Sequence, residues 1–148
     1  MLRRSRASAR PLARLLAAGA VIALLASCRP MSGSEANLFV ATNDLRAEHG
    51  LTALDQQEGL VDQARAWAAT LAARGSLQHS DPDGWSVAWS AVAENVGAST
   101  SMDDLVARLM ASDSHRANML STKYTHMAVG TTVGEDGRIY AVQLFWRG

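Results

Sequence analysis

The sequence predicts an α+β domain in which helices pack against a small antiparallel sheet. Apolar residues recur at helical spacing in three segments between residues 35 and 110. From residue 127 onward, apolar and polar residues alternate around a central turn, as in a β-hairpin. Helices that precede strands along the chain are typical of this fold class. At 148 residues, the chain is long enough for one domain.

Residues 1–27 have the layout of a bacterial export signal. Residues 1–14 contain five arginines and no acidic residue, and the next 13 residues are uncharged. That stretch is shorter than the about 20 apolar residues of a membrane-spanning helix. Cys28, the only cysteine, follows Leu25-Ala26-Ser27, which resembles a bacterial lipobox. We expect cleavage before Cys28 and a diacylglyceryl group on its thiol, which holds a protein stably on a membrane. The alternative is an ordinary secretory signal with an incidental cysteine.

The charge of the remaining chain excludes some classes of function. Without residues 1–27, the chain contains nine basic and 14 acidic residues, so its net charge is about −5 when histidine is neutral. A basic nucleic-acid-binding surface is excluded on these numbers, and we expect no nucleic-acid partner. A single cysteine also excludes a disulfide framework within the chain.

A short tether and two helices are predicted next. Residues 28–36 are small and polar, which is typical of a tether. A first helix is expected over about 35–48, preceded by the capping-box pair Ser32 and Glu35. The pair Asp55 and Glu58 offers a cap for a second helix, which Gly75 ends. The buried faces are predicted to contain Leu38, Ala41 and Leu45 in the first helix, and Leu60, Ala64, Trp67, Ala68 and Leu71 in the second.

The second half of the domain is predicted to contain a loop, two more helices and the hairpin. Residues 76–92 show no sustained period and form a loop with a turn at residues 81–84. A third helix begins at Ser101, with Asp104 completing its cap, and a short fourth helix covers about 113–120. The hairpin strands are expected at Met127–Val133 and Ile139–Trp146.

Two of the four histidines are candidates for a functional site. His49 ends the first helix and His126 begins a strand, and both are expected to be solvated. His79 lies in the loop, and His115 lies in a dense polar stretch between two apolar helical faces. Two imidazoles and a carboxylate suffice for a divalent transition-metal site. Their spacing alone does not place the two histidines in one site.

Four motifs, in order along the chain, resemble the CAP superfamily of cysteine-rich secretory, antigen 5 and pathogenesis-related proteins. The match is to its short bacterial SCP-like branch and covers roughly residues 37–146, so we take 37–148 as the domain. The resemblance implies an α-β-α sandwich with a surface cleft lined by two histidines and, in many members, two glutamates. The motifs are Asn43-x-x-Arg46-x-x-x-Gly50-Leu51, Ala93-Glu94-Asn95-Val96, Ser112-x-x-His115-Arg116-x-Asn118-x-Leu120, and the strands Val129-Gly130 and Tyr140–Phe145.

The resemblance carries over to individual residues of the cleft. His79 matches the first histidine, Glu94 the acid of the Glu-Asn motif, and His115 the second histidine. Ser112 stands at the fourth position, where many eukaryotic members have glutamate. The adjacent Asp113 is a poor substitute for this glutamate, because each step of one residue along a helix turns the side-chain direction by about 100°. We therefore expect weakened divalent-metal binding.

Each motif residue also has a structural interpretation. Glu94 and Asn95 are alternatively predicted to bond loop backbone amides. Arg116 and Asn118 are expected to tie the fourth helix to neighbouring backbone. Trp67 is predicted to lie in the core. Trp85 and Trp89 are either core lids or an apolar rim for a ligand.

The predicted function is ligand binding by a membrane-tethered extracytoplasmic module. The ligand is expected to be a lipid, a sterol-like molecule, or an envelope or host component. It would bind in a cleft formed by His79, Glu94, His115 and Ser112, with zinc or calcium as an expected weakly held cation. The family resemblance implies binding more than catalysis. The missing second acid and the lack of a serine or free cysteine in an activating motif support this choice. The alternatives are a metal-dependent hydrolase with Glu94 as base, a purely structural envelope domain, and secretion without an anchor.

Overall fold

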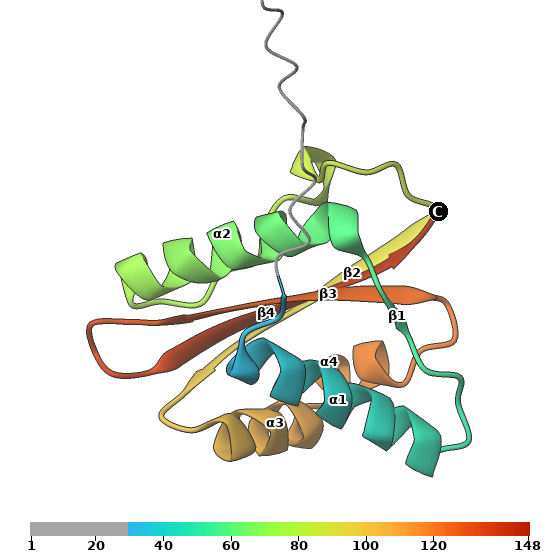
Figure 1. Cartoon of the computed structure of the whole chain (residues 1–148), viewed down its shortest axis with the longest axis horizontal. Helices are drawn as coiled ribbons and strands as arrows, with labels where there is room; N and C mark the ends of the chain where they lie inside the picture. Colours follow the sequence, from blue (N-terminus) through green and yellow to red (C-terminus); the bar gives the residue numbers. More distant parts are fainter. Residues whose placement is uncertain (1–29) are drawn as a thin grey trace, which may run out of the picture.

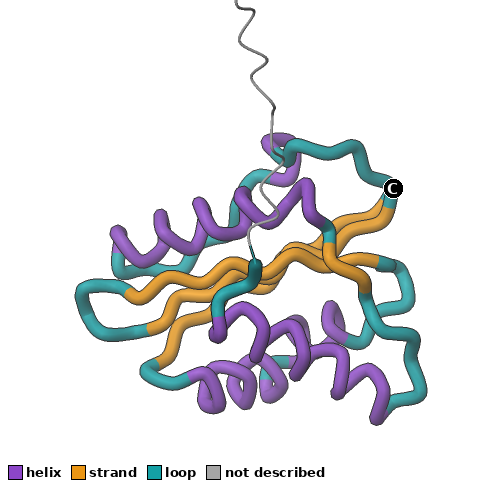
Figure 2. The backbone as a smooth tube through the Cα atoms, in the orientation of Figure 1, coloured by secondary structure: helices purple, strands orange, loops and turns teal. Residues whose placement is uncertain are grey.

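The computed structural model describes residues 30–148, which form three layers (Figure 1). One long helix covers one face of a four-stranded sheet, and three helices cover the other face (Figure 2). This arrangement confirms the predicted α+β class. The elements are α1 (Gly33–Glu48), β1 (Asp55–Gln56), α2 (Glu58–Arg74), the 3-10 turn η1 (Pro82–Gly84), β2 (Ala91–Ser99), α3 (Met102–Ala111), α4 (Asp113–Met119), β3 (His126–Val133) and β4 (Ile139–Arg147).

The predicted export signal, its cleavage position and the acylation of Cys28 lie outside the described residues. Within residues 30–148, no helix has the length and apolar character required to cross a membrane.

Helix α1 begins with the predicted capping box. Ser32 Oγ accepts a hydrogen bond of 3.2 Å from Glu35 N, and Ser32 N donates one of 2.7 Å to Glu35 Oε2. The helix starts at Gly33, two residues before the expected start at 35. The cap therefore operates as the sequence predicts.

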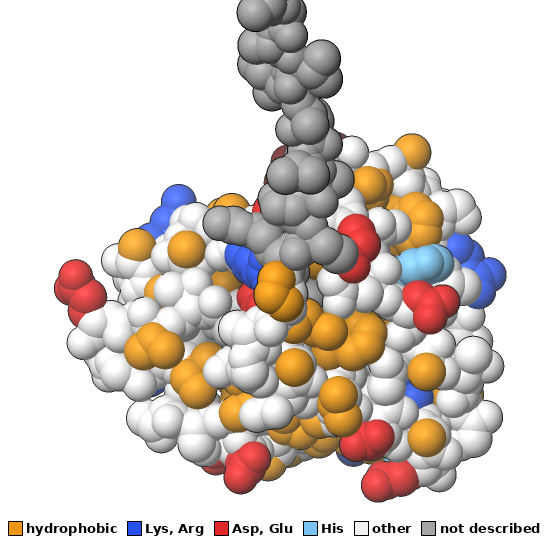
Figure 3. All heavy atoms as spheres, viewed as in Figure 1, with side chains coloured by type: hydrophobic (Ala, Val, Ile, Leu, Met, Phe, Trp, Pro, Cys, Tyr) orange, Lys and Arg blue, Asp and Glu red, His pale blue; other side chains and the backbone are white. Residues whose placement is uncertain are grey.

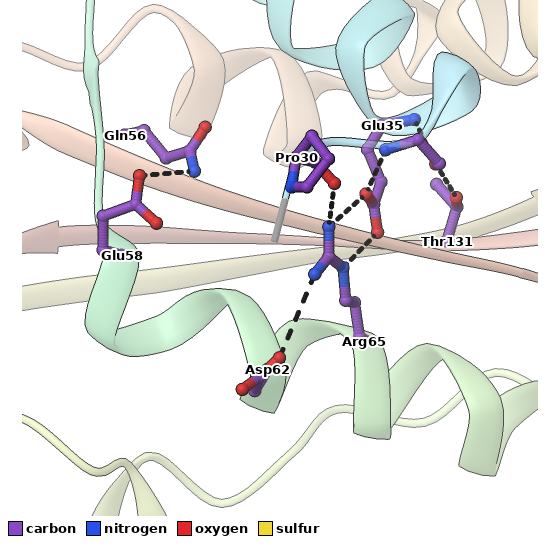
Figure 4. Close-up of polar contacts among 8 residues, drawn as sticks. Pro30, Glu35, Gln56, Glu58, Asp62, Arg65 and Thr131 are labelled. Atoms are coloured by element: carbon purple, nitrogen blue, oxygen red, sulfur yellow. Dashed lines mark hydrogen bonds and ion pairs between the residues drawn. The ribbon is translucent and has the colours of Figure 1, made fainter. Parts of the chain in front are cut away.

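Glu35 has a second partner that the sequence did not predict. Its side chain makes two hydrogen bonds of 2.8 Å with Arg65 of α2, from Nε to Oε1 and from Nη2 to Oε2 (Figure 4). Arg65 Nη2 also donates to the carbonyl oxygen of Pro30, at 3.0 Å. Burial alone would raise the pKa of Glu35, but the bonds from Arg65 and Ser32 and the positive charge of Arg65 lower it. This pair joins the start of α1 to α2.

The predicted cap of α2 at Asp55 is wrong. Asp55 belongs to β1, and its backbone N donates to Thr125 O at 3.0 Å. The helix begins at Glu58, and Gln57 caps it by accepting a bond from Gly59 N. Its predicted end is confirmed, because Gly75 has a left-handed φ of 62°. The predicted face is buried apart from Trp67, which is half-buried at the edge of the core.

The sheet has the order β1-β3-β4-β2. The predicted hairpin is confirmed, with β3 and β4 antiparallel. The sheet is mixed and not purely antiparallel, because β1 pairs with β3 in parallel. Strand β2, which pairs with β4 over nine residues, was not predicted as a strand. One face of β2 is covered by α3 and α4, and the other packs against Trp85 of the loop after α2, so apolar and polar residues do not alternate along this strand.

The sheet separates two apolar clusters. One lies against α2, and the other lies against α1, α3 and α4. Apolar side chains also gather on the surface over α1 (Figure 3), where a groove of about 640 Å³ runs between α1 and α3 and Val40 is exposed. The largest fully buried side chains are Tyr140, Phe145, Leu38, Leu60, Leu71, Leu105, Met119, Met127 and Leu144.

Gly130 allows α2 to lie directly on β3. A Cβ atom at this position would be 2.2 Å from the carbonyl carbon of Ala64 and 2.4 Å from its oxygen. Backbone atoms cannot move aside as the end of a flexible side chain can. Helix and strand are therefore in contact only because residue 130 has no side chain.

Gly130→Ala is predicted to destabilise the domain by about 3 kcal/mol or more, because it forces α2 away from β3. The free energy of unfolding, measured by urea denaturation, tests this expectation. Gly33→Ala is the matched control, because a Cβ atom there meets nothing within 4 Å. Equal stability of the two variants would contradict this account of the packing.

Candidate functional site

Strand β2 presents its two motif residues to opposite layers of the fold. Side chains alternate along a strand, and Val92 and Val96 pack in the cluster on the α2 side. Glu94 therefore lies on the α2 face, and Asn95 lies on the face covered by α4. Because β2 is an edge strand, groups from both layers can approach each other around it.

Glu94 binds the loop that follows α2. His79 Nδ1 donates to Glu94 Oε1 at 2.7 Å, and Ser80 N donates to the same oxygen at 2.9 Å. Ser80 Oγ donates to Glu94 Oε2 at 2.6 Å and accepts a bond of 3.2 Å from Trp85 Nε1. The Glu94 side chain is only 7% exposed, whereas that of His79 is 62% exposed. The buried carboxylate thus orients an imidazole that faces solvent.

Asn95 connects β2 to β4 and α4. Its Nδ2 donates to Gln143 Oε1 at 3.0 Å and to the backbone oxygen of His115 at 3.1 Å. Asn118 Nδ2 donates to Asn95 Oδ1 at 2.9 Å. Gln143 Nε2 in turn donates to Thr42 Oγ1 of α1 at 2.8 Å. These bonds set the position of α4, and therefore of His115, relative to Glu94.

The structural interpretation of the sequence is confirmed for Glu94, whose side chain accepts a bond from the loop amide of Ser80. It is wrong for Asn95, whose side chain bonds two side chains and the backbone oxygen of His115 but no backbone amide. Asn118 ties α4 to a side chain and not to backbone. Arg116 forms an exposed ion pair of 2.7 Å with Asp113 on its own helix. Arg116 therefore stabilises α4 only locally.

His115 lies close enough to His79 for their charges to interact. The side chain of His115 is half-buried, and burial lowers its pKa from the ordinary 6.5. The positive charge of His79 lowers that pKa further. Together with the bond between His79 and Glu94, this places both imidazoles and the carboxylate at one edge of the sheet.

Two hollows lie beside this cluster. One, of about 330 Å³, is lined by His79, Glu94 and Trp85. The other, of about 240 Å³, contains Ser112 and His115. The side chains that give the second hollow its apolar wall are Leu77, Val96, Leu105 and Leu109. Trp85 is buried and forms a wall, whereas Trp89 is exposed and lines neither hollow.

The donors do not fit a metal ion as they are arranged. Within residues 30–148, no three His, Cys, Asp or Glu side chains form a group that could hold one. Both oxygens of Glu94 already accept hydrogen bonds from Ser80 and one also binds His79. An ion would have to displace these bonds.

The other two histidines take no part in the site. His49 is exposed at the end of α1, where its Nδ1 lies 2.9 Å from Leu45 O. His126 is half-buried instead of solvated, because its ring packs edge-on against Trp146 at 5.2 Å between centroids.

Ser80 and Gln143 are site residues that sequence reasoning missed. Ser80 neighbours His79 in the sequence, but its two bonds to Glu94 join residues 14 positions apart. Gln143 lies between apolar residues on both sides in β4, and a polar residue in such a run was a usable signal.

The α-β-α sandwich and the histidine–glutamate cluster at its edge strand agree with the family resemblance of the sequence motifs. The chain belongs to the CAP family, the cysteine-rich secretory protein family, whose model matches residues 39–145. The curated proteins include no match to this chain.

Solved structures show the same fold. An outer surface protein of Borrelia burgdorferi is 16% identical, with a TM-score of 0.72, over 80% of this chain and 96% of that one. An extracellular protein of Bacillus anthracis with an SCP domain is 21% identical, with a TM-score of 0.68, over 81% and 45%. A cysteine-rich secretory protein of Staphylococcus aureus is 27% identical, with a TM-score of 0.60, over 81% and 41%. The chain therefore spans less than half the length of the last two proteins.

The pKa of His115 is predicted to lie below 6.5 in an NMR-monitored titration. The folded state favours the neutral ring of His115. His115 therefore stabilises the folded protein at pH values above its ordinary pKa, and this stabilisation is lost as the pH falls through the lowered pKa. His79→Gln is expected to raise the pKa of His115 but to leave it below 6.5, because burial remains. His126→Gln is the control and leaves it unchanged. A pKa of 6.5 or higher in the unmodified protein would contradict the placement of His115.

Proposed function

We propose that this CAP-domain protein is an extracytoplasmic binding module, tethered to a bacterial membrane, whose ligand contacts the cleft beside β2. The contact of 2.7 Å between His79 and Glu94, with His115 nearby, is the observation that carries the proposal. Because Glu94 holds Nδ1 of His79, Nε2 is the ring nitrogen left to meet a ligand. The ring is largely exposed, so a ligand reaches it without a conformational change.

The chemistry of the cleft suits an amphiphilic ligand such as a lipid or a sterol-like molecule. Its two imidazoles supply hydrogen bonds for a polar group. The hollow of about 240 Å³ next to His115 has an apolar wall for a hydrocarbon part. A polar group beside an apolar surface is also found on envelope and host components, which remain within this ligand class.

Neither zinc nor calcium is required by this proposal. Both ions would compete with Ser80 and His79 for the oxygens of Glu94. No observation favours the alternative of a metal-dependent hydrolase with Glu94 as base, because both oxygens of Glu94 already accept hydrogen bonds from Ser80 and His79.

The tether supports attachment of the domain close to a membrane. Cys28 precedes the first residue of α1, Gly33, by five residues. At full extension this distance is about 17 Å. The carbonyl oxygen of Pro30, two residues after Cys28, binds Arg65, which shortens the free part of the tether. Relatives described as outer surface and extracellular proteins agree with this location.

The ligand is expected to copurify with the full chain from bacterial membranes and to be identified by mass spectrometry of extracted small molecules. The double variant His79→Ala/His115→Ala is expected to copurify with at least about tenfold less ligand than the unmodified protein, because each lost hydrogen bond weakens binding by about 1 kcal/mol. His49→Ala is the matched control and retains the ligand. Equal retention by the double variant would favour a purely structural envelope domain.

Cys28→Ala is predicted to move the protein from the membrane fraction to the soluble extracytoplasmic fraction and to abolish labelling by palmitate. Loss of the thiol removes the site for the diacylglyceryl group. Ser27→Gly keeps a small residue before the cysteine and is expected to leave both properties unchanged. Membrane retention of Cys28→Ala would overturn the anchoring proposal but not the binding proposal.

A further inference from the structure

A separate cavity of about 380 Å³ lies away from the cleft. It is formed where the end of α1, the segment that leads into β1, the segment before β3, and the end of β4 meet. It shares no lining residue with the two hollows beside β2. Its volume is within the range of about 300–1,000 Å³ that is usual for small-molecule sites.

A nearly buried arginine lines this cavity. Arg46 is 3% exposed. Its Nε donates to Thr52 O, and its Nη1 donates to Met119 O and Ser121 O, each at 2.8 Å. Its Nη2 makes no hydrogen bond to any residue between 30 and 148. Because no buried polar side-chain atom in this region lacks a partner, Nη2 keeps some accessible surface, and the cavity is lined by Arg46.

The charge of Arg46 has no counter-ion in the described part of the chain. The ion pairs there join other residues. Burial lowers the pKa of Arg46, and Asp55, whose carboxylate lines the same cavity, forms no ion pair with it. Three carbonyl oxygens offset part of the cost of burying the charge. An anion bound at Nη2 would supply the opposite charge that the protein does not.

The remaining walls of the cavity restrict which anion fits. Arg147 adds a second positive charge, and its Nη2 donates to Thr122 O at 3.3 Å. Asp55 also lines the cavity and repels an ion with two negative charges more than one with a single charge. Leu51 and the buried ring of Tyr124 offer apolar surface.

We infer that this cavity binds a small organic monocarboxylate. The carboxylate receives a charge-assisted hydrogen bond from Arg46 Nη2 and is attracted by Arg147. The compact apolar body of the ligand packs against Leu51 and Tyr124. Asp55 selects a monoanion over a phosphate dianion.

Benzoate is the probe for this site, and benzamide is its neutral counterpart of the same shape. In NMR titrations of the full chain in detergent at constant ionic strength, benzoate is expected to shift the signals of Arg46 Nε and the Tyr124 ring saturably. Benzamide is expected to bind at least about tenfold more weakly, because it lacks the charge that Arg46 requires. Acetate is expected to bind more weakly than benzoate, because it lacks the apolar body. Inorganic phosphate is expected to bind more weakly still.

Three variants test the assignment without removing Arg46, which the fold needs. Arg147→Gln is expected to weaken benzoate binding about fivefold, as is typical of an exposed charge, and Asp55→Asn is expected to strengthen it. Arg74→Gln removes an exposed arginine that does not line the cavity, and it leaves binding unchanged. Equal binding of benzamide and benzoate, or shifts confined to residues outside the cavity, would overturn the inference. Neither result depends on the β2 cleft or on membrane anchoring.

Discussion

The side-chain amide of Asn95 is the contact on which the candidate site depends. It joins β2 to Gln143 of β4 and to Asn118 and the backbone of His115 in α4. Among residues 30–148, no buried side-chain nitrogen or oxygen lacks a hydrogen-bond partner. A buried polar network is stabilising only when all its members are satisfied. The position of α4 is therefore set by specific hydrogen bonds in addition to apolar packing.

Side chains alternate between the two faces of β2, so the neighbouring residues Glu94 and Asn95 have different roles. Asn95 points into the layer of α1, α3 and α4, where it fixes the helix that carries His115. Glu94 points to the α2 side, where it orients His79. The two histidines belong to opposite layers and approach each other only because β2 lies at the edge of the sheet. A central strand would have kept them apart by at least one further strand.

Helix α4 is held near both of its ends by side chains from other elements. Asn95 binds the carbonyl oxygen of His115, and Arg46 binds that of Met119. The carbonyl groups at the end of a helix carry partial negative charge, which matches the charge of Arg46. The same arginine thus has a structural role through Nε and Nη1, while its Nη2 remains available to the second cavity.

Local features of the sequence determined the start of α1, the end of α2 and the hairpin. The capping box of Ser32 and Glu35, the left-handed Gly75 and the alternation around the final turn each depend on residues close together in the chain. The family motifs also indicated His79, Glu94 and His115 as candidates. Tertiary structure alone decided the pairing of β1 with β3 and of β2 with β4. It also decided the bond between Asn95 and Gln143, which are 48 residues apart, and the unpaired Nη2 of Arg46. These features depend on which residues the folded chain brings together, and no local spacing encodes such contacts.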